Sequence, residues 1–336
     1  MKQRAEEILN DDKLLLSRKR WFDRLESLFD GECIDKVIYL NGIYGRSNID
    51  PYKEPERWLT DALDDLASRA DKLLDNEVFR PLCIEFGPYG VHFIDKILGA
   101  NVYFDEISNQ WYNEYIQGHI GQLCYPDLEQ NEAWNLAKRL ARAFIESKVK
   151  VPLFGLPTIA SVLNVAVNLY GQRFLEALYI TPNEAEHDIK VINRLLCDLH
   201  GWYLKNIPID QLQPVISGHR TQPPGFGQLC GCSTQLISSR MYREFIAPFD
   251  DQLLSTYPHG GMIHLCGNHV QHIPVWREMK SLRAIQVNDR AAEDLETYFV
   301  GLREDQIIYL NPTDMMTVEK AIKITKGKRL VIVADI

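Results

Sequence analysis

The feature that most constrains the fold of this chain is the recurrence of short apolar runs between longer amphipathic stretches. Eight runs are rich in β-branched residues and apolar on both faces, as strands buried in a parallel sheet are. Between them lie helical patterns such as residues 132–147, where Leu136, Leu140 and Phe144 fall on one stripe. The eight predicted strands span residues 36–41, 81–86, 151–155, 214–218, 262–266, 284–288, 307–310 and 330–334.

Eight alternating strand and helix units predict an α/β protein with a closed (β/α)8 or TIM barrel, although an open doubly wound sheet has the same local signals. We interpret residues 1–336 as one domain, since the pattern continues without a flexible linker. Residues 1–30 are predicted to form an N-terminal extension of one or two helices. This extension would cap the floor of the barrel or form a lid. No helix is expected after the eighth strand, so the N-terminal helices would cover that flank, or the natural chain would be longer.

Composition excludes several classes of function. The chain of 336 residues is 46% hydrophobic, enough for a large core, and its net charge of -9 argues against a nucleic-acid partner. The first 20 residues lack the apolar region of a secretory signal, and no apolar stretch is long enough to span a membrane. Seven dispersed cysteines fit reduced thiols. We therefore expect a cytoplasmic protein without a membrane partner.

The strongest chemical signal lies at the end of the fifth predicted strand, where His264 and Cys266 are two residues apart. Alternation along a strand places both side chains on the same face, and the C-terminal ends of barrel strands form the active face. An imidazole beside a thiolate is a ligand combination that Zn2+ favours. The alternative is that His264 is a hydrogen-bonded interior histidine and Cys266 a small buried hydrophobe.

Other strand ends offer further candidates for a metal site or for catalysis. Candidate ligands in addition to His264 and Cys266 are Cys230, Cys232, Cys83, Glu85, His219 and Asp335. Glu85 and Tyr89 lie in a glycine-containing loop that would contact substrate, or in a plain surface turn. Asn288 follows the sixth predicted strand and could orient a polar substrate.

Two segments resemble the uroporphyrinogen decarboxylase superfamily, whose members include cobalamin-dependent methyltransferases. They are residues 230–249, CGCSTQLISSRMYREFIAPF, and residues 260–268, GGMIHLCGN, in the family's order and spacing. Residues 20–40 and 86–106 are similar to the family's first strand region and to its Phe-Gly-Pro segment. The resemblance covers most of the chain and implies the barrel fold.

The resemblance also implies a metal site. In the methyltransferase members, the fifth-strand His and Cys and a Cys after the eighth strand hold zinc, which activates a thiol for methyl transfer with a corrinoid protein. Carried over, this implies His264 and Cys266 as ligands. The chain reads LVIVADI at residues 330–336, without the later Cys. Asp335, Cys230, Cys232 or Glu85 would then complete the site, or no stable metal binds.

The resemblance implies a zinc-dependent methyltransferase or demethylase that moves a methyl group between a small molecule or thiol and the methylcobalamin of a corrinoid protein. It also implies a homodimer. One alternative is a decarboxylase of a tetrapyrrole polyacid, which is weakened because residues 41–50 offer only Arg46 to grip carboxylates. The other is a non-catalytic barrel with a degenerate site that binds a corrinoid protein.

Overall fold

The computed structural model describes residues 2–32 and 34–335, with side chains from residue 5 onward, so Cys33 lies outside the described residues. The chain starts with two helices, α1 (Lys2–Ile8) and α2 (Asp12–Phe29). The side chain of Asp11 accepts a hydrogen bond from the backbone N–H of Lys13 and so caps the first turn of α2.

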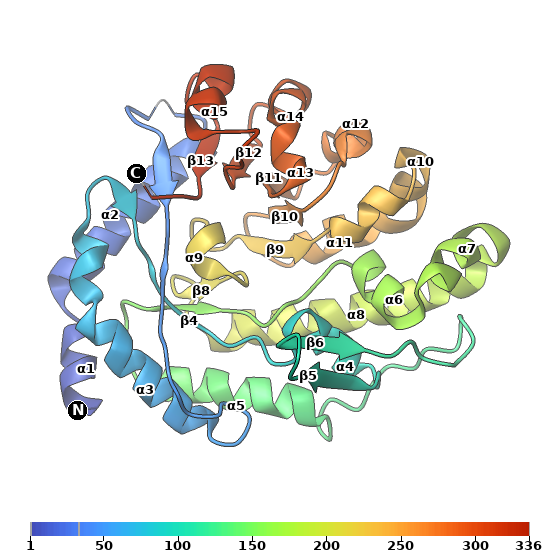
Figure 1. Ribbon diagram of the computed structural model, residues 1–336, viewed down its shortest axis with the longest axis horizontal. Coiled ribbons are helices and arrows are strands. Elements are labelled where there is room, and N and C mark those ends of the chain that lie inside the picture. Colours follow the sequence, from blue (N-terminus) through green and yellow to red (C-terminus); the bar gives the residue numbers. More distant parts are fainter. Residues whose placement is uncertain (1, 33, 336) are drawn as a thin grey trace.

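Seven parallel strands form the larger sheet, in the order β3-β1-β13-β12-β11-β10-β9. First and last strands of the chain are neighbours, because Ile38 of β1 pairs with Val331 of β13 (Figure 1). The strands are β1 (Ile38–Leu40), β3 (Val78–Phe79), β9 (Gly227–Cys230), β10 (Gly261–Leu265), β11 (Leu282–Val287), β12 (Ile307–Leu310) and β13 (Leu330–Ile332).

A second, four-stranded parallel sheet continues from the first. Its strands are β2 (Ile43–Tyr44), β4 (Leu82–Glu85), β7 (Leu153–Gly155) and β8 (Leu212–Gln213), in that order. Residues 38–44 and 78–85 each supply one strand to both sheets, and a single bridge joins Ala160 to Cys230. The predicted α/β architecture with parallel strands is therefore present. The predicted closed barrel is not, because the strands of the described residues form two hydrogen-bonded sheets.

The prediction of a strand at residues 214–218 is wrong. The strand β8 ends at Gln213, and Ser217–Arg220 forms the short helix α9. Ile216 has φ 54° and ψ 45°, the left-handed region that a β-branched residue rarely adopts, so the chain turns there. The structure has β9 at Gly227–Cys230 instead. This strand was not predicted because it follows a Pro-Pro-Gly turn and because its sequence, Gly-Gln-Leu-Cys, is neither apolar throughout nor rich in β-branched residues.

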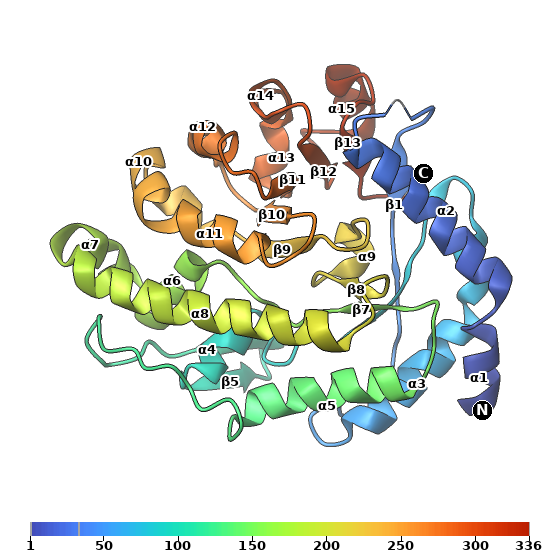
Figure 2. The same cartoon turned by 180° about the vertical axis from the view of Figure 1, so that it is seen from behind.

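Amphipathic helices cover the sheets (Figures 1 and 2). The predicted helix at 132–147 is confirmed as α5 (Glu132–Glu146), which buries Leu136, Leu140 and Phe144. Besides α2 and α5, the helices of more than seven residues in the described part of the chain are α3 (Pro55–Ser68), α6 (Val162–Tyr170), α7 (Gln172–Ile180), α8 (Pro182–Asn206), α11 (Ala247–Leu254) and α15 (Val318–Thr325). Shorter helices are α4 (Phe93–Ile97), α10 (Ser239–Met241), α12 (Ile273–Trp276), α13 (Arg290–Glu293) and α14 (Leu295–Gly301). No helix among the described residues has the length and apolar character needed to cross a membrane.

Helix α2 packs on the N-terminal ends of the strands. Trp21 stacks on Phe79 with ring centroids 5.4 Å apart, and Phe29 meets Phe226 edge to face at 4.7 Å. The guanidinium of Arg18 donates hydrogen bonds to the carbonyl oxygens of residues 150 and 151, just before β7. The N-terminal helices therefore lie at the floor, away from the strand ends that carry the chemistry.

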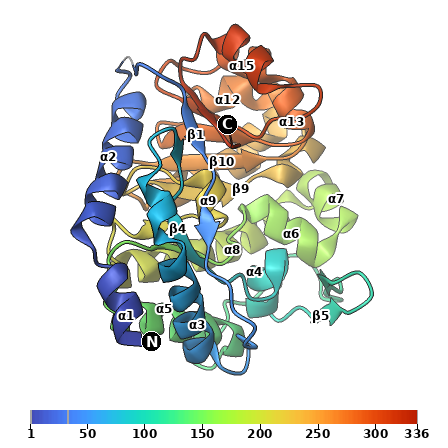
Figure 3. The same cartoon turned by 60° about the vertical axis from the view of Figure 1, so that its left-hand side comes forward.

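An antiparallel hairpin that we did not predict lies outside both sheets. It consists of β5 (Val102–Asp105) and β6 (Gln110–Asn113). Figure 3 shows α1 and α2 along one side of the molecule, and the hairpin strand β5 with α6 and α7 on the opposite side. Trp111 of β6 packs on Tyr89, with ring centroids 5.1 Å apart.

Candidate metal centre

Three side chains that could hold a metal ion meet at the ends of β9 and β10. The donor atoms of Cys230, Cys232 and His264 all lie within 4.8 Å of one another. Cys230 and His264 are paired across the two parallel strands, and Cys232 follows β9 after Gly231. The register between these neighbouring strands therefore brings together residues that are 34 and 32 positions apart in the sequence.

Cys266 adds a third thiol to this group. Its Sγ atom lies 3.0 Å from the Nε2 atom of His264, which confirms that the two side chains share one face of the strand end. The Sγ atoms of Cys230 and Cys232 are 3.5 Å apart. Cys230, Cys232 and Cys266 are half-buried, whereas His264 is 5% exposed. We call these four residues the thiol–imidazole cluster.

The ring of His264 is held in a defined orientation. Its Nδ1 atom contacts the Oε1 atom of Gln286, and the side-chain amide of Gln286 in turn donates to the Oδ1 atom of Asn311. An amide oxygen accepts a hydrogen bond, so we assign the proton to Nδ1. This tautomer leaves the lone pair of Nε2 directed at the thiols, the arrangement by which a metal-binding histidine is oriented.

The electrostatics of the cluster favour thiolates. Hydrogen bonding with Cys232 lowers the pKa of Cys230 and that of Cys266, although burial opposes both shifts. The same two hydrogen bonds raise the pKa of Cys232, which therefore keeps its proton while its neighbours are ionised. Since the thiolate is the form that binds metals, the cluster is prepared for a cation.

The donor set fits zinc. Sulfur and imidazole nitrogen are the ligands of structural and catalytic zinc sites, with Zn–S distances of about 2.3 Å. Two thiolates on one tetrahedral ion would be about 3.8 Å apart on that basis, close to the 3.5 Å between Cys230 and Cys232. The imidazole of His264 is already oriented, and the thiols of Cys230 and Cys232 would move only slightly to bind the ion.

Of the predicted catalytic residues, Asn288 contacts the thiol–imidazole cluster, whereas Glu85 contacts α9. Asn288 has its Nδ2 atom 4.0 Å from the sulfur of Cys266, at the limit of a weak hydrogen bond. Glu85 ends β4, where its Oε2 atom accepts a 2.9 Å hydrogen bond from the backbone N–H of Ser217. Burial raises the pKa of Glu85, while the hydrogen bonds from residues 216 and 217 oppose this shift.

Tyr89 and Asp335 occupy other places. The ring of Tyr89 packs against Trp111 and Tyr52, and burial raises the pKa of its phenol. The carboxylate of Asp335 lies 2.5 Å from the guanidinium of Arg80 and accepts from Asn41 at 2.8 Å. Within the described part of the chain, the structure does not bring Asp335 into the thiol–imidazole cluster.

Cys83 and His219 are also not members of the cluster. Burial raises the pKa of the Cys83 thiol, whose sulfur points to the carbonyl of Pro81 at 3.5 Å. The His219 ring packs edge to face on Tyr44, with centroids 6.0 Å apart.

Sequence reasoning missed Gln286 and Arg220. Gln286 is interior to a predicted strand, where a polar residue between Ile285 and Val287 was a usable signal. Arg220 gave no signal, because the segment around it was assigned to a strand and its following loop. It is 6% exposed, and desolvation lowers its pKa, while the charges of Cys230, Cys232, Cys266 and Glu85 oppose this shift.

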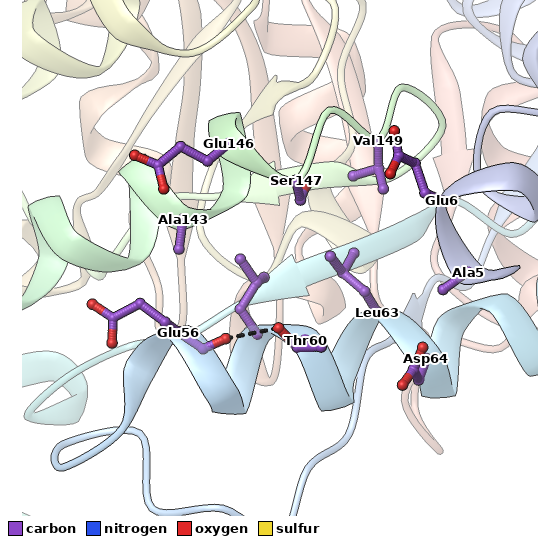
Figure 4. Close-up of a pocket in the computed structure, with 11 residues that line it drawn as sticks. Ala5, Glu6, Glu56, Thr60, Leu63, Asp64, Ala143, Glu146, Ser147 and Val149 are labelled. Atoms are coloured by element: carbon purple, nitrogen blue, oxygen red, sulfur yellow. Dashed lines mark hydrogen bonds between the residues drawn. The ribbon is translucent and has the colours of Figure 1, made fainter. Parts of the chain in front are cut away.

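A separate pocket lies between α1, α3 and α5 and has no thiol or imidazole in its lining. Figure 4 shows Leu63 and Ala143 at its apolar wall and carboxylates of Glu56 and Glu146 at its rim. It offers none of the soft ligands of the cluster, so the chemistry is assigned to the strand ends.

No protein-family model and no curated protein matches the sequence. Among solved structures, a methyltransferase from Methanosarcina mazei is similar to this chain, with a TM-score of 0.53 and 12% sequence identity. The match covers 91% of this chain and 97% of that one. At this identity the likeness concerns the fold. The chain therefore has an α/β fold of mostly parallel strands, similar over nearly its whole length to that of the methyltransferase.

Proposed function

We propose that this protein is a zinc-dependent methyltransferase or demethylase that moves a methyl group between a small thiol or methylated metabolite and the methylcobalamin of a corrinoid protein. The observation that carries the proposal is the meeting of Cys230, Cys232 and His264 at adjacent strand ends. The similar fold of a protein named as a methyltransferase supports it, as does the resemblance of residues 230–249 and 260–268 to the corrinoid-linked enzymes.

Cys230, Cys232 and His264 are the proposed metal ligands, with Cys266 beside them. In this set Cys230 and Cys232, and not Asp335, complete the site around His264, because Asp335 pairs with Arg80. The Cys-x-Cys sequence at the end of β9 supplies the sulfur that is missing from residues 330–336. Bound zinc would stabilise a substrate thiolate at neutral pH and so keep a strong nucleophile available.

Of the remaining residues, Gln286 and Asn288 orient the ligands, and Glu85 exchanges a proton with the substrate. Gln286 holds the His264 ring through Nδ1. Asn288 lies against the Cys266 sulfur, where its amide donates to a thiolate better than to a thiol. Glu85 is proposed to take or return the proton of a substrate thiol, because it is a carboxyl group at the end of β4 whose pKa is raised by burial.

The test is metal content by mass spectrometry on protein purified without chelators. About one zinc per chain is expected, as one tetrahedral site requires. Cys230→Ser, Cys232→Ser and His264→Ala should each lose it. Cys266→Ser should bind zinc more weakly, and Cys124→Ser, at an exposed thiol, serves as the matched control. Absence of zinc after reconstitution would contradict the proposal.

Activity then separates the alternatives. Zinc-loaded protein should demethylate methylcobalamin in the presence of a thiol, which is followed by the absorbance of the corrinoid. Zinc binding without any methyl transfer, to free or protein-bound corrinoid, would favour the non-catalytic barrel. Turnover of a porphyrinogen that persists in the presence of a chelator would favour the decarboxylase.

A further inference from the structure

The two cysteines that flank Gly231 touch each other. The Sγ atoms of Cys230 and Cys232 are 3.5 Å apart, and both residues are free thiols. The two sulfurs of a disulfide lie about 2.05 Å apart, so this pair would have to approach by roughly 1.5 Å. Small rotations of the two side chains supply a movement of this size without displacing the backbone. The pair is therefore placed for oxidation to a disulfide.

The backbone around the pair is held by hydrogen bonds to other segments. The carbonyl oxygen of Cys230 accepts from the N–H of Ser161 at 2.9 Å. The N–H of Gly231 donates to the carbonyl oxygen of His264, also at 2.9 Å. The hydroxyl of Thr234 donates to the carbonyl oxygen of Gly231 at 2.8 Å. None of these bonds uses a sulfur atom, so they hold the turn in place when the sulfurs change partners.

Gly231 allows the turn to lie close to its neighbouring strand. A Cβ atom at this position would lie 2.8 Å from the Cγ2 atom of Ile263 on β10, so a side chain here would push the turn away. Only this one residue separates the two cysteines, and a disulfide that closes so short a loop constrains the unfolded chain little. The bond would therefore act on the site and contribute little to the stability of the fold.

Access and competing thiols favour the same pair. Cys230 and Cys232 are half-buried, so a small oxidant reaches them, whereas Cys83 is fully buried. Cys266 is the competing partner within the thiol–imidazole cluster. Its sulfur contacts the Nε2 atom of His264 at 3.0 Å, whereas the sulfurs of Cys230 and Cys232 contact each other.

We propose that Cys230 and Cys232 form a site of reversible oxidation, at which a peroxide converts the two thiols into a disulfide. One sulfur attacks a peroxide oxygen and becomes a sulfenic acid, with release of one water. The second sulfur attacks the sulfenic sulfur, and the OH group leaves with the proton of this thiol as a second water. Two thiols and one hydrogen peroxide thus give one disulfide and two waters, and two electrons pass from the sulfurs to the peroxide. A dithiol reverses the reaction by thiol–disulfide exchange.

The disulfide would remove two of the three proposed zinc ligands, because only a thiolate binds the metal. Oxidation of the pair and zinc binding are then mutually exclusive, and oxidation stops the proposed methyl transfer. This consequence rests on the proposed function, whereas the oxidation itself needs neither zinc nor methyl transfer.

The test is peptide mapping of the full-length, metal-free protein after treatment with hydrogen peroxide. Trypsin cleaves after Arg220 and Arg240, so the peptide of residues 221–240 carries Cys230 and Cys232 and no other cysteine. This peptide should become lighter by two hydrogen atoms and should no longer react with an alkylating reagent. Dithiothreitol should restore both alkylation sites. Zinc-loaded protein should release about one zinc for each disulfide formed, and a chromophoric chelator measures this release.

Two variants serve as controls. Cys124→Ser removes an exposed thiol and should form the disulfide as the wild type does. Cys232→Ser should form no disulfide, and the remaining Cys230 should stop at a sulfenic acid, which a sulfenic-acid reagent labels. The mapping of the wild type decides the proposal even if this second variant does not fold.

Two outcomes of the mapping would overturn the proposal. The first is that both cysteines of residues 221–240 stay open to alkylation after peroxide treatment. The second is a cross-link between this peptide and the tryptic peptide of residues 244–277, which carries Cys266, because the oxidation would then belong to another pair.

The same measurements separate this proposal from the proposed function. If the disulfide forms but the reduced protein binds no zinc, the oxidation site stands and the zinc-dependent function fails. If zinc binds and methyl transfer occurs, but peroxide leaves both cysteines of residues 221–240 reduced, the proposed function stands and the oxidation site fails.

Discussion

At the scale of single residues, the candidate site depends on polar groups that reach the strand ends from inside the sheets. Gln286 lies on β11, next to β10, and is 2% exposed. Its amide contacts His264 on one side and Asn311 on the other, so one side chain fixes the tautomer of the only imidazole in the cluster. Such supporting contacts typically affect metal affinity strongly.

Removing the support of His264 should weaken zinc binding without removing a ligand. Gln286→Leu, which has a similar volume and no acceptor, is expected to lower zinc affinity about 10–100-fold. Gln286→Glu keeps an oxygen at the same place and should retain most of the affinity. Competition with a chromophoric chelator measures both, with the exposed Gln172→Leu as control. Equal affinities in Gln286→Leu and the wild type would show that His264 needs no orientation.

A second residue-scale effect concerns the buried Asp250, which accepts a hydrogen bond from the Tyr242 hydroxyl at 3.0 Å. Burial raises its pKa from 3.8 to about 7. Between these values the folded protein holds the proton and the unfolded chain does not. The free energy of unfolding therefore falls as pH rises from about 4 to about 7.

Asp250→Asn should remove this contribution. We expect a smaller loss of stability across the same pH window than in the wild type, measured by urea unfolding at several pH values. Asp251→Asn is an unsuitable control because that carboxylate binds Ser281, so the exposed Asp127→Asn is the matched variant. Parallel pH profiles in Asp250→Asn and wild type would contradict the raised pKa.

At the scale of elements, the cluster exists because β9 and β10 approach closely. Both strands begin with glycine, and a Cβ atom on Gly261 would lie 2.3 Å from the carbonyl oxygen of Gly227. Backbone atoms cannot move aside as a flexible side chain can. The register that pairs Cys230 with His264 therefore depends on two glycines at the start of the strands.

Gly261→Ala should consequently disturb both stability and the site. We expect a loss of about 1–3 kcal/mol of unfolding free energy from overpacking, together with weaker zinc binding. Gly118→Ala is the control, because a Cβ at that residue would have no neighbour within 4 Å. Urea unfolding and metal content measure the two effects. Unchanged stability in Gly261→Ala would show that the strands can separate without loss.

At the scale of the whole molecule, the N-terminal helix α2 packs against both sheets at the N-terminal ends of their strands. Arg18 of α2 reaches the residues before β7, while Trp21 packs on β3 and Phe29 on the turn before β9. One helix thus contacts both sheets, at the end opposite to the thiol–imidazole cluster. Its packing stabilises the fold without contributing to the chemistry.

Trp21→Ala should therefore cost stability and leave zinc binding intact in the folded protein. A loss of about 3–5 kcal/mol is expected for a fully buried tryptophan; Trp21 is 1% exposed. Leu16→Ala on the exposed face of the same helix should change little, because Leu16 is 68% exposed. A small effect of Trp21→Ala on the free energy of unfolding would show that α2 is dispensable to the core.

The sequence by itself determined the alternation of strands and helices, because apolar periodicity and helix stripes are local properties. It placed His264 and Cys266 on one face, since neighbours two apart in a strand always share one. It also predicted α5. It misplaced the fourth strand, because the left-handed turn at Ile216 is imposed by contacts of Ser217 and Gly218 with distant segments.

Only the tertiary structure decided which residues join the site. Cys230 and Cys232 were two among several ligand candidates until the parallel pairing of β9 with β10 put them against His264. Asp335 was another until its contact with Arg80 placed it elsewhere. Gln286 gains its role from its contacts with His264 and Asn311, which lie on other segments of the chain. Which strands become neighbours, and in which register, depends on contacts between segments far apart in the sequence, so the local patterns did not single out these residues.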